Sequence, residues 1–175
     1  MRKTEILPWT SEWEVLYEKE AAILRPLLEK NVLNIYHIGS TAIPSVGYAK
    51  PIIDLLVVVS QIEKIDSYNE KMRSLGYKPR GENGIPGRRY FSKGLSNRTH
   101  HVHMYQIGHE NIRKHLLFKE YLLQHPKDAK AYGALKCDLA QKYQHDTHQY
   151  QKGKEEFVNE LVAKALKWKG NKDRG

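Results

Sequence analysis

The sequence predicts an α+β fold, in which a mixed sheet is flanked by helices and followed by a helical C-terminal part. Two observations predict it. Residues 33–38 and 51–59 form short apolar segments separated by a loop rich in glycine and proline, which is typical of buried strands. From residue 111 to residue 168 the apolar side chains instead recur at helical spacing.

The chain has 175 residues, which is enough for one domain with a sizeable core. We expect a single domain over residues 1–175. Its α/β core covers about residues 1–107, and a helical tail over about residues 110–169 packs on that core.

The N-terminal part is expected to form a helix followed by two strands. Ser11 and Glu14 have the spacing of a capping box, which places the start of the helix at Ser11. Pro26 interrupts the apolar repeat that follows, and it predicts a kink or a break into two helices. The second strand, residues 51–59, is apolar on both faces, as a central strand would be.

The middle of the chain is expected to add a helix and a hairpin. Residues 62–75 have helical spacing and end before a glycine. After a short strand at 77–80, residues 88–93 and 99–107 read as antiparallel strands joined by the turn residues 94–97. In the tail, His125-Pro126 and the segment around 145–147 interrupt the helical pattern.

The chain is basic, with a formal net charge of +9, which favours anionic partners without identifying them. Six basic residues and one acid lie between residues 78 and 98. No apolar segment approaches the ~20 residues that cross a membrane, and the N-terminus has no apolar signal core. The single cysteine, Cys137, excludes an internal disulfide. We therefore expect a cytoplasmic protein without membrane contact.

The most informative stretch joins a Gly-Ser pair to an acid within an apolar strand. Gly39 and Ser40 follow the first predicted strand, and Asp54 lies inside the second. A carboxylate is costly to bury alone, so Asp54 either borders a site or has a hydrogen-bonded structural role. Backbone amides of a Gly-Ser turn can approach phosphate closely, because glycine has no Cβ. Gly39, Ser40 and Thr41 are therefore candidate phosphate ligands, with an ordinary strand-to-helix turn as the alternative.

Four blocks of the sequence resemble the GrpB family, within the nucleotidyltransferase superfamily that includes the polymerase-beta-like palm. They are HIGSTAIP at 37–44, AKPIID at 49–54, RYFSKG at 89–94 and RTHHVH at 98–103. The resemblance implies a nucleotidyltransferase-like fold. In that superfamily, acids on the strand after the Gly-Ser turn hold Mg²⁺ during phosphoryl transfer, which implies a metal-binding role for Asp54.

The chain departs from the superfamily pattern at Leu56. A second acid is expected there, on the same face of the strand as Asp54. On the later strand, His101 and His103 share a face where a third acid is expected, and His37 is a further candidate. We therefore expect Asp54, His101 and His103 to be catalytic residues and ligands of one divalent cation. Imidazole favours Zn²⁺ over Mg²⁺ or Mn²⁺, so all three ions are candidates. Exposed polar residues of an amphipathic strand are the alternative.

Three basic residues are candidate phosphate ligands. Arg89 and Lys93 share one face of a predicted strand, and Lys50 lies just before the strand of Asp54. A guanidinium and an ammonium on the same strand face can both contact one bound phosphate. The alternative interpretation of these residues is a basic surface loop without a ligand. We also expect Lys50 or Arg89 to pair with Asp54.

Three functions are compatible with these features. In the first, the protein binds a nucleotide or phosphorylated small molecule and, with a divalent cation, transfers a nucleotidyl group to a small acceptor, with His101 or His103 as base. In the second, a non-catalytic module keeps the fold and has lost the metal cluster. The third, a basic adaptor for RNA or another protein, depends on net charge alone and ranks last, and no nucleic-acid reader motif is present. The sequence specifies no oligomeric state.

Overall fold

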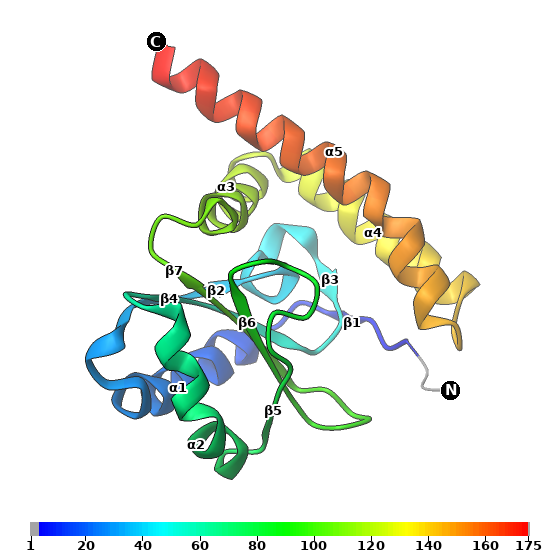
Figure 1. The fold of residues 1–175 in the computed structure, drawn as a ribbon. Helices are drawn as coiled ribbons and strands as arrows, with labels where there is room; N and C mark the ends of the chain where they lie inside the picture. Colours follow the sequence, from blue (N-terminus) through cyan, green and yellow to red (C-terminus); the bar gives the residue numbers. More distant parts are fainter. Residues whose placement is uncertain (1–3, 175) are drawn as a thin grey trace. The chain divides into compact units, whose positions relative to one another are not determined.

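The computed structural model describes residues 4–174 and contains both helices and a mixed sheet, which confirms the predicted α+β class (Figure 1). Contacts along the chain define two compact units. Unit 1 comprises Met1–Thr10, Gly39–Pro51 and Arg113–Gly175, and unit 2 comprises Ser11–Ile38 and Ile52–Ile112. The loop with the Gly-Ser pair therefore groups with the C-terminal helices, which the sequence did not indicate.

A five-stranded sheet forms the centre of unit 2, in the order β2-β4-β7-β6-β5. The parallel pair is β4 with β7, and the other neighbouring strands are antiparallel. Every residue of β4 is buried except Asp54, as expected for a strand in the middle of a sheet. The strands are β2 (Val32–Ile38), β4 (Ile53–Val59), β5 (Tyr77–Pro79), β6 (Arg88–Lys93) and β7 (His100–Gln106).

The predicted hairpin of β6 and β7 is confirmed, and its turn depends on Gly94. This residue has φ of 89°, which lies in the region that glycine favours. A Cβ there would lie 2.2 Å from the carbonyl oxygen of Asn97. Only glycine therefore fits this turn without a backbone shift, and the turn fixes which residues of β6 and β7 are opposite each other.

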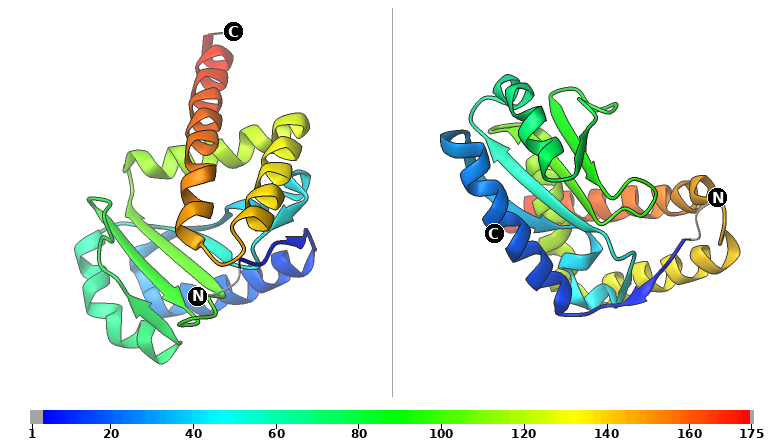
Figure 2. Two further views of the ribbon diagram at one scale, coloured as in Figure 1. Left: turned by 90° about the vertical axis from the view of Figure 1, so that its right-hand side faces the viewer. Right: turned by 90° about the horizontal axis from the view of Figure 1, so that it is seen from below.

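Helical segments cover one face of this sheet. The helix α1 (Glu12–Leu28) packs on β2 and β4 (Figure 2). It starts after Ser11 as predicted, although Ser11 makes no side-chain cap, and it continues through Pro26 to end two residues later. A break at Pro26 is therefore wrong. In place of one helix over 62–75, a 3₁₀ helix η4 (Ile62–Tyr68) leads into α2 (Asn69–Ser74).

Unit 1 contains three helices and a small sheet. A two-residue strand β1 (Leu7–Pro8) pairs antiparallel with β3 (Tyr48–Ala49), and 3₁₀ helices η2 (Ser40–Ala42) and η3 (Pro44–Val46) precede β3. The interruptions predicted near residues 125 and 146 are confirmed. The helices are α3 (Glu110–Gln124), whose first residues belong to unit 2, α4 (Pro126–Lys142) and α5 (Thr147–Arg174).

The core of unit 1 joins the segment after the Gly-Ser turn to the helices. Ile43 and Val46 pack in one cluster with Leu122 and Leu161, and α4 and α5 lie side by side (Figures 1 and 2). At Gly133, an added Cβ would lie 1.9 Å from the carbonyl oxygen of Val46, so α4 approaches η3 backbone to backbone. Among residues 4–174, no helix combines the length and apolar character that crossing a bilayer requires.

Candidate functional site

Asp54 lies at the centre of a small polar cluster on the sheet of unit 2. His101 is its direct partner in the parallel pair of β4 and β7, and His103 is two residues further along β7. The Oδ1 atom of Asp54 lies 3.1 Å from Nε2 of His103 and 3.5 Å from Nδ1 of His101. The side chain of Asp54 is 27% exposed. The structure thus brings together the three residues that sequence analysis selected as catalytic.

The two imidazoles determine the charge of Asp54. Burial alone would raise the pKa of this carboxyl group, but hydrogen bonds from His101 and His103 outweigh burial and hold the pKa well below its ordinary value. Asp54 is therefore ionised at neutral pH, and it provides a fixed negative charge in a partly buried position.

Arg89 and Lys93 project from the other face of the sheet. In the β6–β7 pair, Tyr90 is opposite His103 and Ser92 is opposite His101. Because side chains alternate along a strand, Arg89 and Lys93 lie on the face that α1 and η4 cover. The structure therefore does not bring these two predicted phosphate ligands to Asp54.

Both residues have acidic partners on their own face. The Nε atom of Arg89 donates to Oδ1 of Asp66 at 2.8 Å, so the expected pairing of Arg89 with Asp54 is wrong. The ammonium of Lys93 donates to Oε1 of Glu20 at 2.6 Å. Although burial opposes ionisation of Glu20, hydrogen bonds from Lys93 and Tyr77 hold its pKa below the ordinary value.

His37 also belongs to this helix-covered face. Its ring stacks on Tyr17 of α1, with ring centroids 4.8 Å apart, and it is opposite Leu55 of β4. Leu55 and Asp54 are neighbours in the strand, so they point to opposite faces. His37 is therefore not part of the cluster around Asp54.

Sequence analysis missed the residues that surround the cluster on its own face. The ring centroid of Tyr90 lies 5.6 Å from that of His101 and 5.2 Å from that of His103. One guanidinium nitrogen of Arg98 lies 3.5 Å from Nε2 of His101. The Nε atom of Arg80 donates to the hydroxyl of Ser92 at 2.8 Å. The sequence could have indicated Tyr90. His101 and His103 share one face of β7, and because side chains alternate along the paired strand, the even-numbered residues of β6 lie on that same face.

A third arginine, Arg88, shares this face but is committed to a loop. It is buried, and its guanidinium donates to the carbonyl oxygens of Glu82 and Asn83 at 3.1 and 2.8 Å. Its guanidinium carbon also lies 4.9 Å from the ring centroid of Tyr90. Arg88 therefore holds the loop and the aromatic ring in place.

The Gly-Ser turn and Lys50 belong to unit 1. Gly39 has φ of 75°, which favours glycine, and the next three residues form a 3₁₀ helix. Ser40 is partly exposed, whereas Thr41 is buried and its carbonyl oxygen accepts from Trp9 Nε1 at 2.9 Å. The ammonium of Lys50 lies 4.3 Å from the ring centroid of Tyr150. That the turn and Asp54 face one hollow stays a prediction.

The donor set at Asp54 is a poor match for a metal centre built from protein ligands alone. Among residues 4–174, no group of three or more His, Cys, Asp and Glu side chains is arranged to hold a metal ion. The nitrogens of His101 and His103 instead face the carboxylate itself. A cation at Asp54 would need water and ligand oxygens to complete its shell, as Mg²⁺ often does.

Comparison with known proteins identifies close relatives. Residues 3–164 match the model of the family described as GrpB protein. The chain is 45% identical over 168 residues to UPF0157 protein YqkA of Bacillus subtilis (strain 168), covering 96% of this chain and 49% of that protein. It thus spans about half the length of that relative.

Solved structures agree on the fold. The crystal structure of conserved protein GrpB from Enterococcus faecalis has a TM-score of 0.89 at 41% identity, covering 93% of this chain and 98% of that one. The structure of Cid1 with the UTP analogue UMPNPP has a TM-score of 0.51 at 12% identity, covering 77% of this chain and 42% of that one. At this identity the second likeness concerns the fold alone.

Proposed function

Since the chain belongs to the GrpB family and has the nucleotidyltransferase-like fold, we propose that it binds a nucleotide or another phosphorylated small molecule. The ligand contacts the sheet face that carries Asp54, His101 and His103. One observation carries the proposal: an ionised carboxylate, two imidazoles and two partly exposed arginines, Arg80 and Arg98, share that face.

The two arginines supply the affinity for phosphate. Guanidinium groups stay charged at every physiological pH and bind phosphate oxygens through paired N–H donors. Unlike Arg89, neither Arg80 nor Arg98 has a carboxylate partner within residues 4–174. Both therefore have charge available for an anionic ligand. In this proposal, Gly39, Ser40, Thr41 and Lys50 stay candidate phosphate ligands from unit 1.

A divalent cation is the second part of the proposal. Asp54 would hold Mg²⁺ or Mn²⁺ together with water and phosphate oxygens, and the ion would offset phosphate charge. Zn²⁺ with His101 and His103 as further ligands is the alternative, which requires the imidazoles to turn away from the carboxylate.

Nucleotidyl transfer to a small acceptor is the catalytic form of this function. What favours it is the contact of Asp54 with His101 and His103, because a carboxylate that orients an imidazole is a common arrangement for a general base. What limits it is Leu56, buried at the position of the second acid. Without transfer, the same face serves a non-catalytic binding module.

Thermal unfolding with nucleoside triphosphates tests the proposal. A ligand at 100 times its Kd adds about 2.7 kcal/mol to the free energy of unfolding. We expect stabilisation by at least one nucleotide or phosphorylated metabolite, stronger with Mg²⁺ or Mn²⁺ than with a chelator, and lost in Asp54→Asn. Stabilisation that survives chelation and Asp54→Asn favours the non-catalytic module. Absence of stabilisation by every such compound overturns the proposal.

A further inference from the structure

The outer face of α1, which points away from the sheet of unit 2, exposes several large apolar side chains. Val15, Leu16 and Ile23 are 45%, 41% and 44% exposed. Of the helices within residues 4–174, no other exposes more than one such side chain. Because apolar side chains that gather on a surface mark interaction sites more often than scattered ones do, this face of α1 is a candidate for binding another protein.

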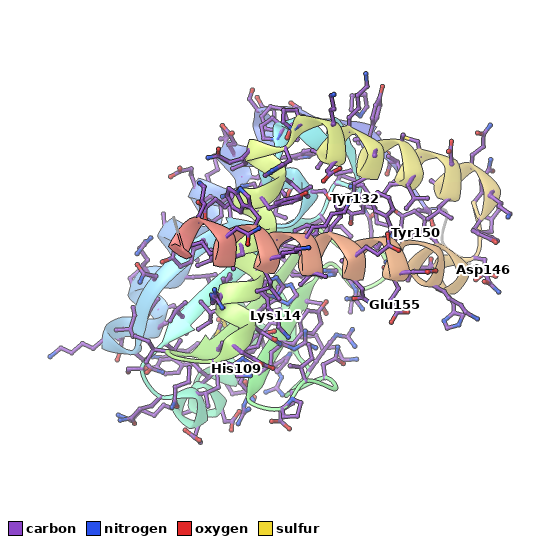
Figure 3. All side chains as sticks on the ribbon, turned by 90° about the horizontal axis from the view of Figure 1, so that it is seen from above. His109, Lys114, Tyr132, Asp146, Tyr150 and Glu155 are labelled. Atoms are coloured by element: carbon purple, nitrogen blue, oxygen red, sulfur yellow. The ribbon has the colours of Figure 1, made fainter. Side chains whose placement is uncertain are left out.

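The longest helix, α5, has the more usual kind of outer face. Figure 3 shows Glu155 on the side of α5 away from Tyr132 of α4, and the other exposed residues of that helix are nearly all polar. Among the described residues of α5, no large apolar side chain is exposed. An apolar outer face is therefore a specific property of α1 and is not shared by the long helices in general.

The exposed apolar side chains of α1 form one continuous stripe. With 3.6 residues per turn, Val15, Leu16, Ala22 and Ile23 fall within about 120° of the helix circumference. All four are exposed, and the buried residues of α1 lie on the opposite side. Lys19 is the polar member of the stripe, and its long aliphatic stem can carry the ammonium to the edge of a contact.

A charged stripe runs along one side of the apolar stripe. Glu14, Glu18 and Arg25 follow one another at intervals of four and seven residues, so they share one side of the helix. The acids are in the N-terminal half, and the arginine is in the last turn. None of the three has an ion-pair partner within residues 4–174. Each end of the stripe therefore has unpaired charge of the sign that the other end lacks.

A second copy of the chain, packed antiparallel on α1, would match both stripes at once. A two-fold axis between antiparallel helices brings the same side of each helix together. The register that puts Leu16 level with Ile23 of the second copy also puts Glu14 level with Arg25 of the second copy. A parallel pair would instead put the two acidic ends level with each other. Charge complementarity thus selects a second copy in one orientation.

We propose that α1 is the two-fold interface of a homodimer. The apolar stripes bury each other at the centre, and the ion pairs between Glu14 and Arg25 at the rim set the antiparallel orientation. The inference is independent of the proposed function. Since α1 lies on the sheet face opposite Asp54, a second copy bound to α1 contacts neither that carboxylate nor its histidines.

Sedimentation equilibrium over a range of protein concentrations tests the dimer. One helix pair buries less than the ~1,600 Å² of a standard interface, so we expect a weak dimer with a Kd of about 1–100 µM. Leu16→Glu should raise this Kd at least about tenfold, because dimerisation would bury the new carboxylate. Leu123→Glu is the matched control. It makes the same change at a residue of α3 that is 45% exposed, and it should leave the Kd unchanged.

Charge reversal tests the orientation. Arg25→Glu puts like charges level with each other, and the two-fold axis repeats the change, so we expect the Kd to rise about tenfold. Glu14→Arg should have the same effect. The double variant Glu14→Arg, Arg25→Glu restores opposite charges and should recover most of the association. All these positions are exposed, and circular dichroism checks that each variant keeps its fold.

Three results would overturn the inference. A wild-type protein that stays monomeric up to about 500 µM would leave the stripe to a partner other than a second copy. A dimer with the same Kd in Leu16→Glu and Arg25→Glu would use another surface. Losses in both single reversals without recovery in the double variant would contradict the antiparallel register. Each of these results leaves nucleotide binding at Asp54 to its own test.

Discussion

The carboxylate of Asp54 and the imidazole of His101 face each other across two parallel strands, with Oδ1 and Nδ1 3.5 Å apart. The second ring nitrogen, Nε2, faces the guanidinium of Arg98, which can only donate. A neutral His101 that satisfies both neighbours carries its proton on Nδ1 and accepts at Nε2. The imidazole therefore connects the negative and the positive group of the candidate site.

Asp54→Asn should remove an acid-sensitive part of the free energy of unfolding. The folded chain lowers the pKa of Asp54, so the unfolded chain binds this proton more readily. The resulting stabilisation is complete above the ordinary pKa of 3.8 and is lost as the pH falls towards the lowered pKa. In urea unfolding from about pH 7 to below about pH 3, the difference between wild type and variant should shrink as the pH falls. A difference independent of pH would contradict the ionic role of Asp54.

Arg98→Gln should weaken nucleotide binding about tenfold, because a guanidinium contact to phosphate is a charge-assisted hydrogen bond. Arg89→Gln is the matched control. It removes the same charge from the neighbouring strand, on the opposite face and already bound to Asp66, so affinity should stay within about twofold. Calorimetric titration with the nucleotide that stabilises the protein best measures both. Equal losses in the two variants would indicate a general charge effect rather than a contact.

Gly133→Ala should destabilise the protein by about 1–3 kcal/mol, the usual cost of forcing extra atoms into a packed core. The new Cβ would lie 1.9 Å from the carbonyl oxygen of Val46, so α4 or η3 has to shift. Gly170→Ala on α5 meets no atom within 4 Å, and it should stabilise by up to about 1 kcal/mol through helix propensity. Thermal unfolding compares the two. Unchanged stability of Gly133→Ala would mean that the two segments are not in close contact.

The strands of unit 2 and the cluster around Asp54 could be predicted because local patterns determine them. The turn before residue 98 fixes the β6–β7 hairpin, and the spacing of His101 and His103 puts both on one face. The same alternation separates Arg89 from Tyr90 and places it on the opposite face from the cluster. Its partner Asp66 could not be predicted, because which elements cover that face depends on tertiary packing.

Unit 1 was less predictable because its contacts join distant segments. The strands β1 and β3 have only two residues each, which is too short for an alternating pattern.

Pro26, in unit 2, is a position where a local sequence pattern led to a wrong prediction. The sequence predicted an interruption there, yet the helix needs only two further residues before it ends, so the missing N–H affects its last turn alone.

The division of the chain into interleaved units limits how the protein can be dissected. Neither unit is a continuous piece of polypeptide, since residues 39–51 are inserted between two segments of unit 2. A truncation at residue 112 would delete all three helical partners of Ile43 and Val46 while leaving those apolar side chains in place. Recombinant fragments cut at such a point would expose apolar side chains and tend to aggregate. To study one unit in isolation, a circular permutant or a redesigned linker is needed instead.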